Sequence, residues 1–310
     1  MTNRGVYPLP AWGECRFDYY RATVGCASVD HLLKVMSADL DPTGSLRFTA
    51  DRRPPVAYYP QHVVLLDRLG REACSVFWGG QSINPNVEAK GHKAPAIAEV
   101  LRRHWPHLPS RVDPMREATR DGLFRDVRDV AFSLAERHRM DPPKEIRNNH
   151  PDQGDTFYLG SRKSAACIRV YQPGLKRAQE EGRTGDLISD EERNAVRCEL
   201  EFKPQKRKAK VAASTLTPDA MWGISPYVAD FAAEVFAMDV QPISIAERRE
   251  SNRNRALRCM GSQYQRHLAD LWDECGHDLA EFGAAIAQLA DLSPLDKCNS
   301  FGQGDERSAA

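Results

Sequence analysis

The sequence lacks an excess of charge of either sign, and it lacks any long apolar run. Its 310 residues contain 43 Lys plus Arg and 43 Asp plus Glu, so the formal net charge is zero. This excludes a protein that binds nucleic acid through a global positive field, and any contact with DNA must use a local basic patch. No apolar run approaches the roughly 20 residues of a membrane span. Residues 1–14 are polar and do not resemble a signal peptide, so we expect no membrane association.

Closely spaced cysteines are also missing. The eight cysteines are scattered over the chain and include no Cys-x-x-Cys pair. Disulfide-stabilised domains are short and rich in cysteine, and zinc modules need closely paired ligands, so neither class fits. We expect most of these cysteines to be reduced, small and buried, and we expect the compartment to be the cytosol.

The sequence does contain enough apolar residues, 41%, to form a core. Residues 41–62 are predicted as loop or edge strand, and 175–194 as a polar stretch with short helical pieces. Strands are predicted at 16–24, 62–69, 73–78, 156–160, 166–171 and 195–203, and helices at 29–36, 94–104 and 121–139. Because there is no regular strand–helix–strand rhythm, the pattern indicates an α+β fold rather than a doubly wound one.

The character of the chain changes after residue 210, where helical patterns replace strands. Helices are predicted at 218–238, 245–257 and 260–292, broken near Pro242 and Gly261. No segment of 20–50 residues repeats, which argues against a solenoid. We therefore predict a sheet-containing domain at 1–212, a helical region at 213–292 and a flexible tail at 293–310.

Alternation in the later strands gathers charged residues on one face. In residues 196–202, Arg197, Glu199 and Glu201 alternate with apolar residues, so they line one face of a strand. In residues 168–171, Arg169 and Tyr171 share a face in the same way. An ordinary solvated sheet face is the alternative interpretation of this pattern.

Such a face suits phosphodiester chemistry. Carboxylates on one strand face are hard oxygen ligands for Mg²⁺ or Mn²⁺. A bound ion would polarise and position a phosphodiester, and a tyrosine hydroxyl beside cationic groups could attack it. The product would be a covalent phosphotyrosine link to a DNA end.

Three segments carry a family resemblance. Residues 156–164 read TFYLGSRKS, residues 169–171 read RVY and residues 197–201 read RCELE. They resemble the T-x-Y-x-G-S-R-x-S, R-x-Y and R-x-E-x-E signature of the replication initiation factor family. These proteins are trans-type rolling-circle initiators of plasmids and filamentous phages, related to relaxases of integrative conjugative elements. Residues 110–113 also resemble the family's S-R-x-D strand, and the likeness covers most of residues 14–292.

The resemblance implies an antiparallel sheet flanked by helices, distantly related to the HUH endonucleases but without their two-histidine motif. The sequence agrees, since it contains no His-x-His pair. By resemblance, Tyr171 is the nucleophile and Arg169 its electrostatic neighbour. The implied ligands of the divalent ion are Asp113 and Glu199, with Glu201, Asp18 and Glu117 as additional candidates. The implied contacts to DNA in the signature turn are Ser161, Arg162 and Lys163.

The sequence departs from the family pattern at two prolines. Pro173 stands where the family commonly has a lysine two places after the tyrosine, and Lys176 is the candidate substitute. Pro114 is expected to interrupt the strand after Asp113, because proline cannot donate to a strand ladder. Glu117 then stands where the family has a second aspartate.

A basic run follows the last predicted strand, and it is a candidate clamp for DNA phosphates. Its charged members are Lys203, Lys206, Arg207, Lys208 and Lys210. The alternative is a solvated linker, in which case a second cluster would provide the binding surface. That cluster consists of Arg248, Arg249, Arg253, Arg255 and Arg258.

The sequence thus predicts a sequence-specific, metal-dependent DNA nicking and closing enzyme that initiates rolling-circle replication of a phage or plasmid in the cytoplasm of a bacterial host. Its expected partners are double-stranded origin DNA and single-stranded DNA, with a host helicase and a second copy of the chain as further candidates. Two alternatives remain. One is a conjugative relaxase with the same chemistry, and the other is a DNA-binding regulator without catalysis.

Overall fold

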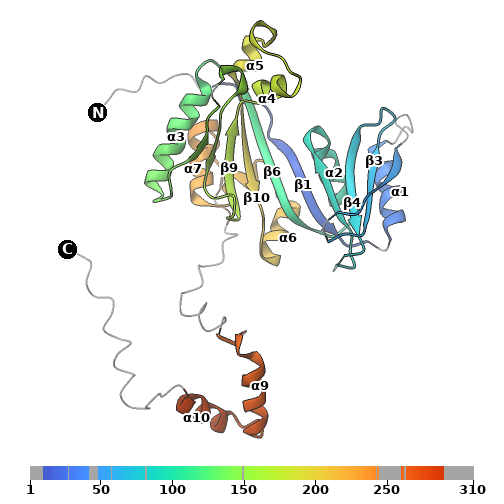
Figure 1. Ribbon diagram of the computed structural model, residues 1–310, viewed down its shortest axis with the longest axis vertical. Helices are drawn as coiled ribbons and strands as arrows, with labels where there is room; N and C mark the ends of the chain where they lie inside the picture. The colour runs from blue at the N-terminus through green and yellow to red at the C-terminus, as the bar shows by residue number, and fades with distance from the viewer. Residues whose placement is uncertain are drawn as a thin grey trace, which may run out of the picture. The chain divides into compact units, whose positions relative to one another are not determined.

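The computed structural model describes residues 10–241, except 27, 42–47, 57, 81 and 149, together with 243, 260–261 and 263–289. The chain divides into two compact units, residues 1–246 and 247–310. The first unit contains one ten-stranded sheet (Figure 1) in the order β2-β3-β4-β5-β1-β6-β10-β9-β8-β7. All neighbouring strands pair antiparallel. The predicted α+β class, an antiparallel sheet flanked by helices with further helices toward the C-terminus, is confirmed.

The sheet is built from two halves that have the same order of elements: a strand, a helix, four strands and a closing helix. The first half contains β1 (Arg16–Val24), α1 (Val29–Leu40), β2 (Thr49–Arg53), β3 (Gln61–Leu66), β4 (Glu72–Trp78), β5 (Asn86–Lys90) and α2 (Ala94–His104). The second half contains β6 (His107–Thr119), α3 (Leu123–Arg137), β7 (Lys144–Ile146), β8 (Thr156–Leu159), β9 (Ala166–Tyr171), α4 (Pro173–Glu180), α5 (Asp190–Asn194), β10 (Ala195–Phe202) and α6 (Arg207–Thr215). The helix α7 (Pro226–Phe236) follows.

The two halves also have the same strand order. The first half runs 2-3-4-5-1 from its outer edge, and the second runs 7-8-9-10-6 from the opposite edge. The first strands of the halves, β1 and β6, pair antiparallel at the centre, where Tyr19 lies opposite Asp113 and Arg21 opposite Arg111. This arrangement relates the halves by an approximate twofold axis between β1 and β6. The helices α4 and α5 form an insertion found only in the second half.

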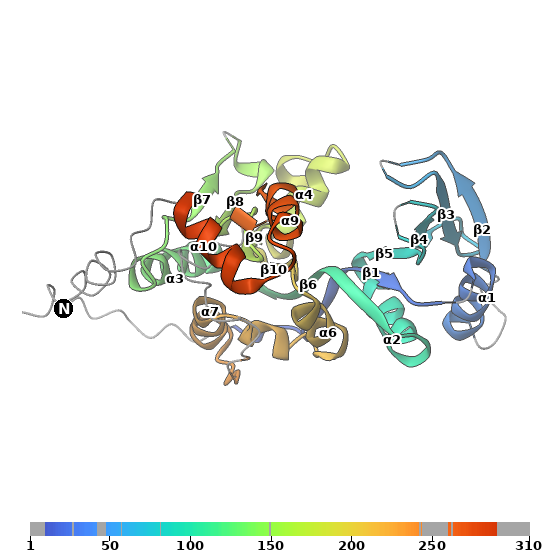
Figure 2. The ribbon, with the colours of Figure 1, turned by 90° about the horizontal axis from the view of Figure 1, so that it is seen from below.

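The core lies on one face of the sheet. Cys198, Leu200 and Phe202 of β10 point into it and are buried. Helices α2, α6 and α7 lie on one side of the strands (Figure 2) and supply the opposing apolar side chains. Trp222 and Phe231 are fully buried, with ring centroids 6.0 Å apart. Burial of each large apolar side chain contributes on the order of 2 kcal/mol to the free energy of unfolding. Because the apolar side chains gather on this face, the other face of the sheet is left for polar residues.

Most predicted elements are confirmed to within a few residues, including the helix at 94–104 and the strands at 156–159, 166–171 and 195–202. The predicted interruption at Pro114 is wrong, because β6 runs unbroken through it for 13 residues. Pro114 lies opposite Phe17, next to a register shift between Phe17 and Tyr19. The pairing of β6 with β10 lapses at Asp113 and Pro114, between the pairs Met115–Glu199 and Val112–Phe202, while its pairing with β1 continues across the bulge.

The cysteine prediction holds for the residues that the structure describes. Cys15, Cys74, Cys167 and Cys198 are buried and free, whereas Cys26 and Cys275 are half-buried. No described helix is both long and apolar enough to cross a bilayer.

The second unit contains α9 (Gln265–Glu274) and α10 (Leu279–Leu289). The prediction of a single helix at 260–292 is therefore wrong, because α9 ends at Glu274 and a separate helix begins at Leu279. Asp278 accepts hydrogen bonds from the backbone N–H groups of Ala280 and Glu281 and so begins a new helix. The arginine cluster at 248–258 and the helix predicted at 245–257 lie outside the described residues.

Candidate active site

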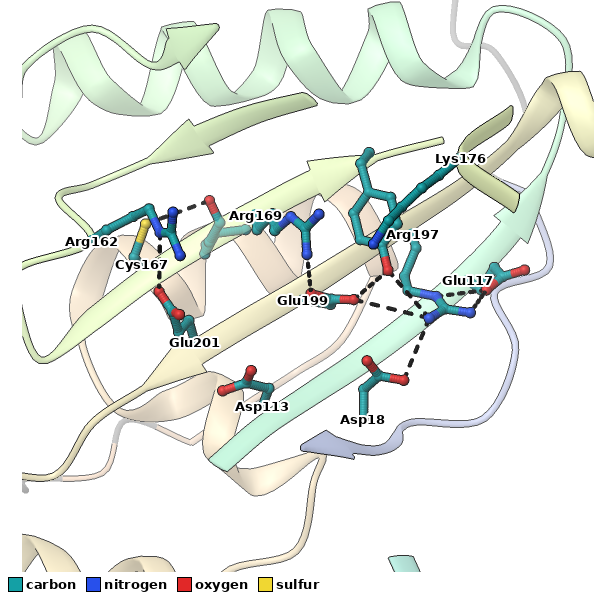
Figure 3. Close-up of polar contacts among 12 residues, drawn as sticks. Asp18, Asp113, Glu117, Arg162, Cys167, Arg169, Lys176, Arg197, Glu199 and Glu201 are labelled. Atoms are coloured by element: carbon teal, nitrogen blue, oxygen red, sulfur yellow. Dashed lines mark hydrogen bonds and ion pairs between the residues drawn. The ribbon is translucent and has the colours of Figure 1, made fainter. Parts of the chain in front are cut away.

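Strands β6, β9 and β10 bring the charged residues of the second half together on the face opposite the core. Arg197 lies opposite Tyr171 on β9 and opposite Glu117 on β6. Glu199 lies opposite Arg169. Residues directly opposite each other in a sheet share a face, so the alternation in the sequence converges on one site (Figure 3).

The side chain of Tyr171 is held at the centre of this site. Its hydroxyl donates a hydrogen bond of 2.6 Å to Oε1 of Glu199 and accepts one of 3.3 Å from Nη1 of Arg197. The Arg169 guanidinium lies over its ring, 4.1 Å from the centroid. Burial, and then the negative charge of Glu199, raise the pKa of Tyr171 well above its ordinary value. The phenol is therefore protonated at neutral pH, and its proton is directed at Glu199.

Glu199 is positioned to receive that proton. The residue is only 6% exposed, and burial raises the pKa of its carboxyl above the usual range, although Tyr171 and Arg169 oppose the shift. Nη1 of Arg169 lies 3.4 Å from Oε2 of Glu199. Each carboxylate oxygen of Glu199 therefore faces a different partner.

Arg197 connects Tyr171 with two further carboxylates. Its Nε and Nη2 lie 2.8 and 2.7 Å from Oε2 of Glu117, and its Nη1 lies 3.4 Å from Oδ1 of Asp18. Burial alone would lower the pKa of Arg197, but Tyr171 and Glu117 raise it overall, so the guanidinium stays charged. The sequence placed Arg197 on this face but assigned it no role. Asp18 and Glu117, predicted as metal ligands, instead pair with Arg197.

A second acidic group lies beside Glu199. Nη2 of Arg111 lies 2.5 Å from Oδ2 of Asp113 and 2.9 Å from Oε1 of Glu201. Asp113 is 3% exposed, and burial raises its pKa to about 7. Arg111 opposes this shift, whereas the charges of Glu199 and Glu201 add to it. Arg111 is a site residue that the sequence analysis missed, although it lies within the S-R-x-D segment.

Asp113, Glu199 and Glu201 offer carboxylate oxygens on one face, and carboxylate oxygens are the type of ligand that a hard divalent ion prefers. Across the described ranges, no group of three or more His, Cys, Asp or Glu side chains stands in an arrangement that would hold a metal. Arg111 engages Asp113, and Arg169 faces Glu199. The neighbouring carboxylates nevertheless raise the pKa of Asp113, and a divalent cation would relieve that repulsion. By this criterion the residues fit an ion.

The signature turn between β8 and β9 lies beside Glu201. Ser161, Arg162 and Lys163 are exposed, and the Arg162 guanidinium lies 5.3 Å from the centroid of the Tyr158 ring. Nε of Arg162 is 3.8 Å from Oε2 of Glu201, and Nζ of Lys203 is 3.2 Å from the same oxygen. The turn therefore presents basic groups at the edge of the acidic group.

The remaining members of the basic run begin a helix. Lys206 is the N-cap of α6, and Arg207, Lys208 and Lys210 lie in its first turns. Lys206, Arg207 and Lys208 are exposed, whereas Ala209 is buried. Positive charge at a helix N-terminus opposes the helix dipole. Helix stability therefore does not explain these cations, and a phosphate-binding role would.

The second proline departure also has a structural explanation. Pro173 is the first residue of α4, a position that suits proline. This helix places Nζ of Lys176 5.8 Å from the centroid of the Tyr171 ring (Figure 3). The Lys176 cation therefore lies near Tyr171, although Lys176 comes about one helical turn after Pro173, the position at which the family commonly has a lysine.

Part of this chain is similar in sequence to a known family. Residues 116–265 match the replication initiation factor family. The resemblance seen in the sequence is confirmed. The segment that matches replication initiation factors includes Tyr171, Arg197 and Glu199, whereas Asp113 precedes it. No curated protein matches the chain. Among solved structures, a rolling-circle replication initiator protein from Geobacillus stearothermophilus is 14% identical, with a TM-score of 0.46, over 74% of this chain and 98% of that one.

Proposed function

We propose that this chain is a DNA nicking and closing enzyme that initiates rolling-circle replication, with Tyr171 as its nucleophile. The observation that carries the proposal is the contact between the Tyr171 hydroxyl and the buried Glu199 carboxylate, at 2.6 Å. Arg169 and Arg197 flank the same hydroxyl group and ring. The match of residues 116–265 to replication initiation factors supports the biological role.

Nicking begins when the Tyr171 oxygen attacks the phosphorus of a DNA phosphodiester and its proton passes to Oε1 of Glu199. The new tyrosyl O–P bond forms as the bond from phosphorus to the 3′ oxygen breaks. The 3′ oxygen takes up a proton and leaves as a 3′ hydroxyl, so the 5′ end stays attached to Tyr171. Arg169 and Arg197 stabilise the negative charge that builds up on the attacking oxygen and on the phosphorane.

Closing is the reverse of this step. A 3′ hydroxyl loses its proton to solvent as it attacks the phosphotyrosine, the O–P bond to Tyr171 breaks, and the phenolic oxygen recovers a proton from Glu199. The covalent link keeps the energy of the phosphodiester bond, so no other energy source is needed for rejoining.

Asp113 and Glu199 would hold a Mg²⁺ or Mn²⁺ ion, with Glu201 as the adjacent carboxylate. When bound, such an ion polarises the phosphodiester and neutralises its charge. Glu199 can serve both functions because its Oε2 is directed away from the tyrosine that Oε1 contacts.

Contacts to DNA outside the cleavage site would come from the signature turn, residues 161–163, and from the basic run that opens α6. Both are exposed and basic, and both adjoin the strand that carries Glu199 and Glu201. Double-stranded origin DNA and single-stranded DNA are the substrates this arrangement suits. A host helicase and a second copy of the chain are the further partners we propose.

The test is the variant Tyr171→Phe, with Tyr158→Phe as the matched control. Supercoiled DNA that carries the cognate origin is incubated with protein and Mn²⁺, and open circles and protein–DNA adducts are measured. We expect Tyr171→Phe to bind DNA but to give no adduct at the 5′ end, whereas Tyr158→Phe keeps both activities. Nicking by Tyr171→Phe at the wild-type rate would refute the assignment.

A further inference from the structure

The first half of the sheet repeats part of the frame of the candidate active site, without a nucleophile at the corresponding position. In the second half, the pair Tyr171 and Arg197 joins β9 to β10. The corresponding pair between β4 and β5 is Phe77 and Asn86. Phenylalanine has no hydroxyl, so this half retains the aromatic ring without a nucleophile.

The carboxylate of the site is repeated as well. Glu88 lies two residues after Asn86, as Glu199 lies two residues after Arg197. Arg21 donates a hydrogen bond of 2.8 Å to Asn86, lies 3.5 Å from Glu88, and sits 5.7 Å from the centroid of the Phe77 ring. A ring, a carboxylate and a stacked arginine therefore recur together in the first half.

A pocket of about 530 Å³ opens over this group. It is lined by Arg53, His62, Glu72, Phe77, Glu88 and Lys90, among others. Glu88 lies opposite Arg21, and Arg21 lies opposite Arg111. Because opposite residues share a face, the pocket and the Tyr171 site open on the same face of the sheet.

The pocket combines a flat aromatic wall with hydrogen-bond acceptors. The His62 ring stacks on Phe77, with centroids 4.5 Å apart and planes inclined by 22°. Nε2 of His62 lies 3.2 Å from Oγ of Ser75, which itself donates to Oε1 of Glu72 at 2.8 Å. Since the Ser75 hydroxyl proton goes to Glu72, its oxygen accepts from Nε2 of His62. This chain fixes the ring orientation of His62 and leaves carboxylate oxygens at the pocket wall.

We infer that this pocket binds an unpaired nucleobase that carries an exocyclic amino group, from the same DNA strand that the Tyr171 site cleaves. The inference rests on the proposed function. Aromatic rings stack on unpaired bases, and glutamate accepts hydrogen bonds from amino groups such as N4 of cytosine. Arg53, which pairs with Asp51, and Lys90, which pairs with Glu88, add positive charge to the lining, which suits a ligand that carries phosphates. Thymine, which has no amino group, is the base this pocket fits least.

The position of the pocket on the sheet sets the distance from the cleavage site. From β9 to β4 there are five strand spacings, through β10, β6, β1 and β5. At about 4.8 Å each, this is roughly 24 Å along the sheet. The bound base is therefore several nucleotides away from the cleaved phosphodiester, and it anchors the strand without taking part in chemistry.

The experiment uses the full chain carrying Tyr171→Phe, so that DNA is bound but not cut. The probe is an oligonucleotide of about 12 cytosines, within the usual footprint of a single-strand site, with one 5-iodocytosine for photocrosslinking. We expect a crosslink to peptides of β3 or β4. We also expect oligo(dC) to bind more tightly than oligo(dT), and Glu88→Gln to remove that preference.

The added variant His62→Ala should weaken oligo(dC) binding about tenfold, the size expected for loss of stacking on one base. His31→Ala, an exposed histidine on α1, is the matched control and should bind like the parent. Thermal melting of each variant separates loss of binding from loss of folding. Crosslinks confined to other strands, or binding that neither pocket variant changes, would overturn the inference.

The outcome is separable from that of the proposed function. If wild-type protein nicks origin DNA but no crosslink reaches β3 or β4, this inference fails and the proposed function stands. If the crosslink forms but no tyrosyl adduct does, the pocket stands and the nicking assignment fails.

Discussion

The two halves of the sheet hold equivalent glutamates whose pKa values shift in opposite directions. Burial raises the pKa of Glu199 above its ordinary value, which favours uptake of a proton by this carboxylate. Burial would also raise the pKa of Glu88, but Lys90 and Tyr19 outweigh it and hold that pKa below its ordinary value. Nζ of Lys90 lies 2.7 Å from Oε1 of Glu88. At the corresponding position, two residues after Glu199, the second half has Glu201.

The two glutamates therefore differ in their surroundings: burial, together with Asp18, raises the pKa of Glu199, whereas Lys90, Tyr19 and Arg21 keep Glu88 ionised. A lysine beside Glu88 keeps it ionised and suited to accept hydrogen bonds from a ligand. A glutamate beside Glu199 and Asp113 keeps the second half rich in negative charge. The same backbone frame thus carries the proposed cleavage site where the ring has a hydroxyl, and the proposed binding pocket where it does not.

The largest expected effect comes from removing the proton acceptor in one half and its counterpart in the other. Glu199→Gln should slow cleavage of bound DNA by about 10²- to 10⁴-fold, the usual contribution of a general base. Glu88→Gln should act on the dissociation constant for single-stranded DNA instead. Single-turnover cleavage with saturating DNA separates the two effects. Equal slowing of the bound-state rate by both variants would remove the functional distinction between the halves.

Most of the second half could be predicted from the sequence, because its strands show strict alternation and carry a signature. The pattern alone placed Arg197 with Glu199 on one strand face and Arg169 with Tyr171 on another, and the pairing of β9 with β10 joins these faces. The pairing of Arg197 with Asp18 could not be predicted, since these residues are 179 positions apart and meet only through the β1–β6 pairing. The internal duplication was also not visible, because equivalent positions such as Phe77 and Tyr171 share ring geometry rather than sequence.

The prediction about Pro114 failed for a related reason. Proline cannot donate to a ladder, but β6 remains one strand because it also pairs with β1, which lies almost one hundred residues earlier in the sequence. Lys176, the candidate substitute for the family's lysine, lies near Tyr171 because a helix that starts at Pro173 brings the fourth residue back over the strand end. Local patterns therefore predicted the elements, whereas the contacts between distant strands needed the structure.

The second prediction tests the acidic group of the second half through pH. The pKa of Asp113 rises from 3.8 to about 7 on folding, so the folded protein binds more protons than the unfolded chain between these values. Stability should therefore fall as pH rises from about 4 to 7, and the penalty is fully present above pH 7. A cation held by Asp113 would offset that penalty most at high pH.

We therefore expect Mn²⁺ to raise the melting temperature more at pH 8 than at pH 6. At a concentration about a hundredfold above its Kd, the ion should add about 2.7 kcal/mol to the free energy of unfolding. Asp113→Asn should lose most of this gain, whereas Glu117→Gln, whose carboxylate is engaged by Arg197, should keep it. A gain independent of pH, or one that survives in Asp113→Asn, would place the ion elsewhere.

The smallest expected effect concerns the basic run at the start of α6, where Arg207 and Lys208 follow the N-cap Lys206, whereas Ala94 and Pro95 follow the N-cap Lys93 of α2. The formally neutral chain cannot rely on a global field, so its affinity for phosphate should be concentrated in such local groups. Replacing Lys206, Arg207 and Lys208 by alanine should weaken DNA binding. It should also lower the slope of log affinity against log salt by up to about 0.9 for each phosphate that the protein no longer neutralises. Cleavage of saturating, pre-opened single-stranded DNA should be largely kept, because the strand carrying Glu199 is unchanged.

The matched control for this triple variant replaces Lys34, Arg68 and Arg177, three exposed cations on other elements, and removes the same formal charge. Binding measured from about 50 to 300 mM salt covers the range in which counterion release is visible. If the two triple variants give the same slope, the effect comes from net charge alone and the start of α6 is not a phosphate clamp. A flatter slope only for the α6 variant would place the clamp next to the strand that carries the proposed nicking residues.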